Sequence, residues 1–217
     1  MLYSIARFFF TIIFKVLFRF QVFGRSNFPR KGAFIVAANH LSYLDPILLG
    51  ISSPRKLNFI AKDDLFKIKV FGFLISNVGA IPVKMDAKQN IGVFRSALSL
   101  LSKGNGFVIF PEGARSLNGK MQNMRAGVGF LAIKSQCPVI PVLIIGTEKA
   151  LPLRAKCIRL KKITAYVGKA LLPPLDSKGH GSFEEFSHRV EDSIRDLKRR
   201  VDNIGKLKYV KKRNKDF

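Results

Sequence analysis

A histidine and an aspartate lie close together in NHLSYLD, residues 39–45. A histidine takes a proton from a hydroxyl near neutral pH because its reference pKa is about 6.5. A carboxylate on its other ring nitrogen would fix the tautomer and stabilise the imidazolium. Since residues at this spacing lie on different sides of a regular helix, His40 and Asp45 meet only if the chain turns between them. The pair predicts a general base, and it equally fits a structural hydrogen bond or a helix cap.

A second polar segment, FPEGARS at residues 110–116, follows a short apolar run. Pro111 ends a strand, and the glycine after the acidic residue allows a close backbone approach or a positive φ. Arginine in such a turn presents a planar fork of donors that binds a phosphate through two hydrogen bonds, and the serine adds a donor. The glutamate would accept hydrogen bonds from a substrate hydroxyl or pair with the arginine. The candidate substrate-binding residues are Glu112, Gly113, Arg115 and Ser116.

Together, the two segments resemble the glycerolipid acyltransferase family, in which an NHxxxxD block precedes an FPEGxRS block. That family has a glycine-rich strand motif between the blocks and a hydrophobic–proline–hydrophobic motif after them. Gly79–Val83 and Val139–Val142 stand in those places, and the resemblance extends over residues 33–147. Order, spacing and predicted strand ends all agree with the family pattern.

This resemblance implies direct transfer of an acyl group from acyl-CoA or acyl-carrier protein to the hydroxyl of a lysophospholipid. The best-known members act on 1-acyl-sn-glycerol-3-phosphate and make phosphatidic acid. By the same resemblance, His40 is the catalytic base and Asp45 orients it, while the FPEGARS residues hold the glycerol-phosphate end. The implied partners are the membrane, the acceptor lipid and the acyl donor. No metal or other cofactor is expected.

One departure from the family pattern concerns the acceptor. The middle motif of the family usually ends in an arginine that helps to bind the acceptor phosphate, and the position here is Met85. Lys84, directly before it, would supply a point charge but no bidentate fork. Lys88 and Arg95 are weaker candidates for that charge. The acceptor stays open between 1-acylglycerol-3-phosphate and another lysolipid, such as a lyso-aminolipid.

Apolar runs that alternate with helical patterns must position both segments. The predicted strands are 33–38, 57–61, 80–83, 107–110, 139–145 and, nearer the sheet edge, 158–167. Helices are predicted over 45–51, 70–76, 90–101 and 127–133, and another follows a capping box at Ser182–Glu185. This alternation predicts an α/β fold with a mostly parallel central sheet flanked by helices. Both polar segments then follow strand ends, where such folds commonly build their sites.

The N-terminal residues form an amphipathic pattern with large aromatic side chains. Its polar residues recur every three or four positions, and phenylalanine, isoleucine, leucine and valine fill most of the rest. This is typical of a helix in the membrane interface, although a terminal helix packed on the core would share it. The longest run without charge, Val70–Val83, is shorter than the roughly 20 apolar residues of a membrane span. We expect an interface helix over 1–24, the acyltransferase domain over 25–202 and a basic tail over 203–217.

The chain has 217 residues, with 38 Lys+Arg against 14 Asp+Glu and a formal net charge of +24. Such an excess of positive charge predicts a polyanionic partner, either an anionic membrane or nucleic acid. An RNA-binding protein is the remote alternative, but it explains neither the N-terminus nor the two motifs. We therefore expect no specific nucleic acid. Cys137 and Cys157 are far apart and fit a reducing compartment. From the family resemblance and these cysteines, we expect the protein to lie peripherally on the cytoplasmic face of the inner membrane.

Overall fold

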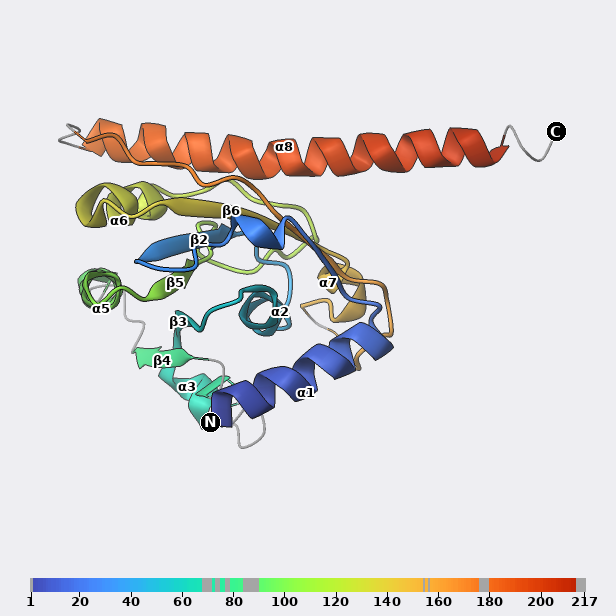
Figure 1. Ribbon diagram of the computed structural model, residues 1–217, viewed down its shortest axis with the longest axis horizontal. Coiled ribbons are helices and arrows are strands. Elements are labelled where there is room, and N and C mark those ends of the chain that lie inside the picture. The colour runs from blue at the N-terminus through green and yellow to red at the C-terminus, as the bar shows by residue number, and fades with distance from the viewer. Residues whose placement is uncertain are drawn as a thin grey trace.

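A seven-stranded sheet forms the centre of the computed structural model, which describes residues 2–67, 72, 75–76, 79–83, 90–153, 155, 157–175 and 180–213 (Figure 1). The strand order is β1-β7-β6-β2-β5-β3-β4. The strands are β1 (Gln21–Phe23), β2 (Phe34–Ala38), β3 (Leu57–Lys62), β4 (Ala80–Val83), β5 (Gly106–Ile109), β6 (Val139–Ile145) and β7 (Thr164–Val167). The helices are α1 (Leu2–Leu17), α2 (Asp45–Ser52), α3 (Asp63–Phe66), α5 (Asn90–Ser102), α6 (Gly127–Ser135), α7 (Thr147–Ala150) and α8 (His180–Arg213), with a short 3-10 helix η1 (Arg25–Asn27).

Most neighbouring strands run parallel. Strand β2 pairs in parallel with both β5 and β6, and β3 pairs in parallel with β5 and β4. Only the pair formed by β6 and β7 is antiparallel among the paired strands that the structure describes. The predicted α/β fold with a mostly parallel sheet is confirmed.

Two apolar layers cover the two faces of the sheet. In β2, the side chains of Phe34 and Val36 join one buried cluster and that of Ile35 joins the other, as the alternation of a strand requires. Helices α1 and α2 pack on the first face, while α5, α6 and α8 pack on the second (Figure 1). Because β2 is buried on both sides, its carboxyl end is held firmly in the middle of the molecule.

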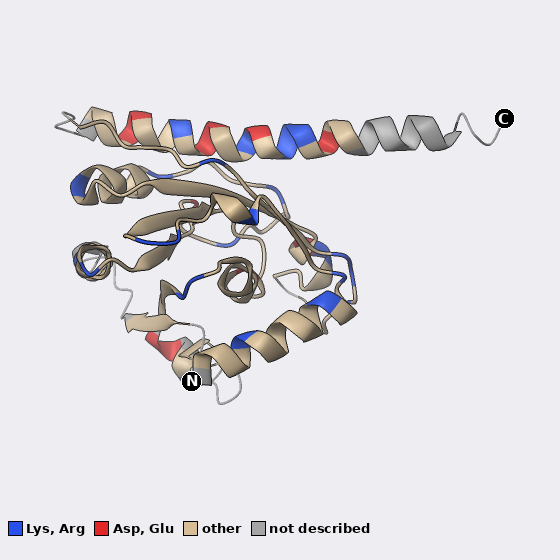
Figure 2. Cartoon of the chain, in the orientation of Figure 1, with Lys and Arg blue, Asp and Glu red and all other residues tan. Residues whose placement is uncertain are grey.

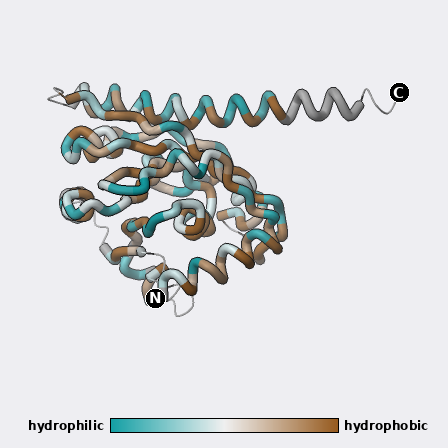
Figure 3. Tube along the Cα trace, in the orientation of Figure 1, coloured by the Kyte–Doolittle hydropathy of each residue, from teal (hydrophilic) through white to brown (hydrophobic). Residues whose placement is uncertain are grey.

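The N-terminal segment is a helix followed by a strand. Helix α1 ends at Leu17, and residues 21–23 form β1, which pairs with β7. The prediction of one helix over residues 1–24 was therefore too long. Phe14 and Phe18 are buried in the core, whereas Phe8 and Phe9 on the other side of α1 are exposed, and Figure 3 shows the apolar character of this helix. Within the described residues, every helix is too short or too polar to cross a bilayer.

The C-terminal half differs from the sequence expectation in two places. The strand expected over 158–167 contains only Thr164–Val167, and it lies second from the edge of the sheet, beside β1. Helix α8 begins at His180, so the Ser182–Glu185 box lies within its first turns, and it continues to Arg213, beyond the sheet (Figure 1). The basic residues from 203 onward therefore continue α8 as far as Arg213. The expected helix over 70–76 lies mostly outside the described residues.

Helices α6 and α8 approach each other closely at Gly129. A Cβ atom added there would overlap the backbone carbonyl of Phe183, and the Gly129 N–H donates to the Ser187 hydroxyl at 2.9 Å. Since α8 covers one face of the sheet, this contact sets how closely α6 and α8 pack in the apolar layer on that face.

The substitution Gly129→Ala should therefore lower the free energy of unfolding by about 1–3 kcal/mol, because two helices must move apart. Gly92→Ala in α5 is the matched control, since its new methyl would meet nothing within 4 Å. We expect that control to raise stability by up to about 1 kcal/mol. Urea unfolding of the three proteins measures both changes, and equal effects at the two positions would refute the close-contact argument.

Candidate active site

The carboxyl end of β2 leads directly into the turn that holds His40. The preceding residue, Asn39, is buried, and its side chain forms two hydrogen bonds to the backbone of β6. Its Nδ2 donates to the carbonyl of Ile144 at 2.9 Å, and its Oδ1 accepts from the N–H of Ile144 at 2.7 Å. This pairing continues the β2–β6 contact past the end of the ladder. It fixes the backbone immediately before His40.

The turn brings His40 against Asp45, as the sequence predicted. Nδ1 of His40 lies 2.9 Å from Oδ2 of Asp45, and the same oxygen accepts the backbone N–H groups of Leu41 and Ser42, both at 2.7 Å. The aspartate is fully buried at the first residue of α2, where a carboxylate is favoured. A proton held on Nδ1 by this contact leaves Nε2 of the imidazole as the nitrogen that accepts a proton.

Glu112 connects the second motif to the first. Its Oε1 accepts the backbone N–H of His40 and its Oε2 accepts the N–H of Gln122, both at 2.9 Å. The side chain is buried, and burial raises the pKa of its carboxyl group, although the two N–H groups act in the opposite direction. We expected Glu112 to bind substrate. In the structure its carboxylate joins the two loops around His40, and its contact with substrate stays a prediction.

Arg115 and Ser116 complete this connection. The guanidinium of Arg115 lies over the ring of Tyr43, with its Cζ atom 3.4 Å from the ring centroid. The Nη1 atom of Arg115 is buried and has no hydrogen-bond partner among the described residues. A buried guanidinium N–H is suited to an anionic acceptor. Ser116 donates its N–H to the carbonyl of His40 at 3.0 Å and its hydroxyl to Asn118 at 3.0 Å.

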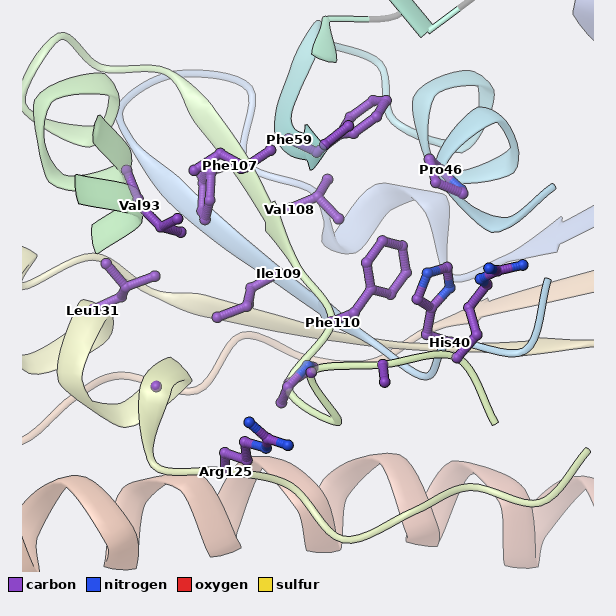
Figure 4. A pocket seen from close by; sticks show the side chains of 18 of the residues that line it. His40, Pro46, Phe59, Val93, Phe107, Val108, Ile109, Phe110, Arg125 and Leu131 are labelled. Atoms are coloured by element: carbon purple, nitrogen blue, oxygen red, sulfur yellow. The ribbon is translucent and has the colours of Figure 1, made fainter. Parts of the chain in front are cut away.

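A cavity of about 680 Å³ extends from His40 into the protein (Figure 4). Its size lies in the range of small-molecule sites, roughly 300–1,000 Å³. The inner part is apolar and is formed by β3, β5, α5 and α6, with side chains that include Phe59, Val93, Val108 and Leu131. The ring of His40 stacks on Phe110, with centroids 3.9 Å apart, at one end of this cavity. An apolar chain with a reactive head group fits such a shape.

Arg125 is a site residue that we did not predict from the sequence. It lines the cavity together with Gly113 and Arg115. A Cβ atom added to Gly113, whose φ is +76°, would lie 3.1 Å from Nε of Arg125, so the guanidinium packs directly over this glycine. The N–H of Arg125 donates to the carbonyl of Pro111 at 3.0 Å, which fixes its place (Figure 4). The signal in the sequence was weak, because a single arginine before a helix is a common surface residue.

The remaining candidates lie elsewhere. Lys84, Met85 and Lys88 are outside the described residues, so the structure does not place the charge expected near position 85. Arg95 lies exposed on α5 and is absent from the cavity lining. In the described part of the chain, no group of three or more His, Cys, Asp or Glu side chains is arranged to hold a metal ion.

Comparison with known proteins agrees with this geometry. A family model described as Acyltransferase matches residues 19–145. A chloroplastic 1-acyl-sn-glycerol-3-phosphate acyltransferase from Brassica napus is 31% identical over 137 residues, which cover 62% of this chain and 40% of the relative. A 1-acyl-sn-glycerol-3-phosphate acyltransferase from Helicobacter pylori (strain J99) is 29% identical over 148 residues, 67% of this chain and 60% of the relative. This chain thus spans less than two thirds of the length of these curated relatives.

A solved structure is also similar. The crystal structure of the 1-acyl-sn-glycerophosphate (LPA) acyltransferase PlsC from Thermotoga maritima has a TM-score of 0.77 and 29% sequence identity, covering 94% of this chain and 79% of that one. The family match takes in β2, α2, β5 and β6, which carry the His40–Asp45 pair and the loop of Glu112 and Arg115. This chain belongs to the acyltransferase family.

Proposed function

We propose that this chain transfers a fatty acyl group from an acyl thioester to the free hydroxyl of 1-acyl-sn-glycerol-3-phosphate and so forms phosphatidic acid. The thioester is that of coenzyme A or of acyl-carrier protein. The observation that carries the proposal is the His40–Asp45 pair, 2.9 Å apart, at one end of an apolar cavity that Arg115 and Arg125 also line. The names of the relatives support this choice of acceptor.

In the proposed reaction, Nε2 of His40 takes the proton of the acceptor hydroxyl as that oxygen attacks the thioester carbonyl. The tetrahedral intermediate then collapses, the carbon–sulfur bond breaks, and the imidazolium returns the proton to the leaving thiolate. Asp45 stabilises the imidazolium through Nδ1. The nearby hydroxyl groups of Ser42 and Ser116 already donate to Leu151 and Asn118. In this proposal the acyl group passes directly from thioester to acceptor, without an acyl-enzyme.

Each part of the substrates has a suitable surface. The acyl chain would occupy the apolar interior of the cavity, where its burial is favourable. The acceptor phosphate would lie against Arg115, whose Nη1 is buried without a partner among the described residues, and against Arg125. These two arginines would supply positive charge and planar sets of N–H donors to the phosphate. A different lysolipid remains the alternative acceptor, because Met85 stands where the family pattern has arginine.

We further propose that the protein attaches to the membrane from the cytoplasmic side of the inner membrane without spanning it. The acceptor stays in the bilayer, and α1 exposes Phe8, Phe9 and Val16 with no acidic residue in the helix. A helix of this type binds the membrane interface. The formal net charge of +24 would also attract acyl-CoA and acyl-carrier protein, which are both acidic.

Replacing His40 with alanine tests the general base. We expect acyl transfer to fall about 10²–10⁴-fold, which is the usual contribution of a positioned base. The assay supplies labelled acyl-CoA or acyl-carrier protein and 1-acyl-glycerol-3-phosphate in anionic vesicles. His188→Ala, an exposed histidine on α8, is the control and should keep wild-type activity.

The products formed by the three proteins identify the acceptor and the role of His40. Phosphatidic acid made by wild type and by the His188 variant, but not by the His40 variant, supports the reaction, the acceptor and the base together. Acylation of another lysolipid that depends on His40 would replace the acceptor and keep the chemistry. Near-normal turnover by His40→Ala would remove His40 from the mechanism.

Arg125→Ala tests the phosphate site. A lost hydrogen bond to a charged group costs about 1.5–3 kcal/mol, so the acceptor KM should rise by about tenfold or more. Arg125→Lys keeps the charge without the planar fork and should give an intermediate value. Arg95→Ala removes an exposed arginine outside the cavity lining and should change little. An acceptor KM that is unchanged in Arg125→Ala would exclude this residue from the site.

Glu112→Gln tests how much the two hydrogen bonds accepted by the Glu112 carboxylate contribute to stability. The substitution places an NH₂ group opposite one backbone N–H, so the free energy of unfolding should fall by about 1–3 kcal/mol. Burial raises the pKa of Glu112 in the folded protein above its value in the unfolded chain. The protonated carboxyl group therefore contributes to the free energy of unfolding, fully at pH values below the unfolded-state pKa. This contribution is lost as pH rises through the folded-state pKa. Glutamine does not titrate, so the stability gap between wild type and variant should narrow as pH rises. Urea unfolding at several pH values measures this gap, and a gap that widens would contradict the assignment.

A further inference from the structure

The segment 157–162, between α7 and β7, combines exposed apolar and basic side chains. Ile158 and Leu160 are 54% and 60% exposed. Arg159, Lys161 and Lys162 are exposed beside them. From Lys149 to Leu175 the sequence contains no acidic residue. A group of large exposed apolar side chains indicates a surface with a partner.

The backbone holds this segment in a defined shape. The N–H of Arg159 donates to the carbonyl of Ala150 at 2.8 Å, and the N–H of Lys161 donates back to the carbonyl of Arg159, also at 2.8 Å. A hydrogen bond between residues two positions apart closes a three-residue turn. Leu160 is the central residue of that turn. Its apolar side chain is therefore presented outward by a fixed backbone, with a basic residue on each side.

The segment is continuous with the exposed face of α1. The N–H of Ile163 donates to the carbonyl of Phe18 at 3.0 Å, and the N–H of Gln21 donates to the carbonyl of Ile163 at 3.3 Å. The chain leading into β7 thus runs beside the C-terminal end of α1, where Val16 and Leu17 are exposed (Figure 1). Figure 2 shows only basic charges on α1. Two elements that are far apart in the sequence form one apolar and basic surface.

This surface lies at the same edge of the sheet as His40. Thr164, which follows the segment, pairs with Ile145 at the end of β6, and Asn39 binds the neighbouring Ile144. The hydroxyl of Ser42 donates to the carbonyl of Leu151 at 2.9 Å, next to the carbonyl that accepts from Arg159. The segment is therefore linked by backbone contacts to α1 on one side and to the turn of His40 on the other.

We propose that the segment 157–162 is a second contact with an anionic lipid bilayer. Leu160 and Ile158 enter the interface between headgroups and acyl chains, and Arg159, Lys161 and Lys162 bind the anionic headgroups. With α1 it gives a two-point attachment, which fixes the tilt of the protein and holds the mouth of the cavity at the membrane surface. The inference rests on the membrane attachment proposed above and adds the residues that set the orientation.

Charge reversal tests the basic part of this contact. Each basic residue near an anionic surface raises membrane affinity about fivefold. The double variant Lys161→Glu with Lys162→Glu should therefore bind phosphatidylglycerol vesicles more weakly by at least that factor per residue. Co-sedimentation with the vesicles measures this affinity. Lys103→Glu with Lys134→Glu is the matched control, because it makes the same change in net charge at exposed positions near the starts of β5 and β6. Equal losses in the two double variants would show that total charge alone governs binding and would overturn the proposal.

The two cysteines allow a direct test of insertion. Cys157 is exposed and Cys137 is buried, so a thiol-reactive fluorophore labels the segment selectively in the full chain. We expect lipids with spin labels on their acyl chains to quench this fluorophore in anionic vesicles. The control carries Cys157→Ser and Leu172→Cys, since Leu172 is 69% exposed beside Leu171, which bridges to Val139 at the other end of β6. Equal quenching at both positions, or none at position 157, would refute insertion.

Leu160→Ser tests the apolar part and separates this inference from the enzymatic proposal. The variant should bind vesicles several-fold more weakly than Leu172→Ser, and it should transfer acyl groups normally to acceptor dispersed in detergent. Vesicle binding and quenching need no turnover, so they decide the role of the segment even if wild type transfers no acyl group. Tight binding to RNA that depends on Lys161 and Lys162, with wild-type vesicle binding in the same variant, would assign the surface to another partner.

Discussion

Two buried carboxylates organise the whole site, and each is stable only because backbone N–H groups point at it. A carboxylate without such donors would pay a large cost of desolvation. One oxygen of Asp45 accepts from Leu41, Ser42 and the ring of His40, while the two oxygens of Glu112 accept from His40 and Gln122. The backbone and the ring of one histidine are thereby fixed by two acidic residues from different loops. The loop after β2 and the loop after β5 are therefore connected at His40.

The sheet supplies the rigid frame that these contacts require. Strand β2 lies between β5 and β6, and its side chains are fully buried on both faces. The loops after β2 and β5 therefore emerge side by side at one edge, as parallel pairing dictates. The side chain of Asn39 extends the pairing with β6 by one more step. In the proposed reaction, the base His40 must approach a hydroxyl within hydrogen-bond distance, and a fixed position favours that approach.

Much of this arrangement could be predicted from the sequence, because it depends on local patterns. Apolar runs and polar strand ends located β2, β5 and β6, and the turn between His40 and Asp45 followed from their spacing. What could not be predicted depends on long-range contacts. Arg125 joins the site only through its hydrogen bond to Pro111 and its packing over Gly113. Likewise, the outermost strand β1 was not predicted, because no pattern in Gln21–Phe23 marks these residues as the strand that pairs with β7.

The distribution of charge supports one orientation of the molecule. Along residues 180–204 of α8, acidic and basic residues alternate, and pairs such as Arg195 with Glu191 and Lys198 with Asp202 neutralise each other (Figure 2). Helix α1, on the opposite face of the sheet, carries no acidic residue. Paired charges contribute little attraction to a distant anionic surface, whereas unpaired basic residues contribute fully within a Debye length of about 8–10 Å. In the attachment proposed above, α1 and its exposed phenylalanines therefore face the bilayer, and residues 180–204 of α8 lie on the opposite side of the sheet.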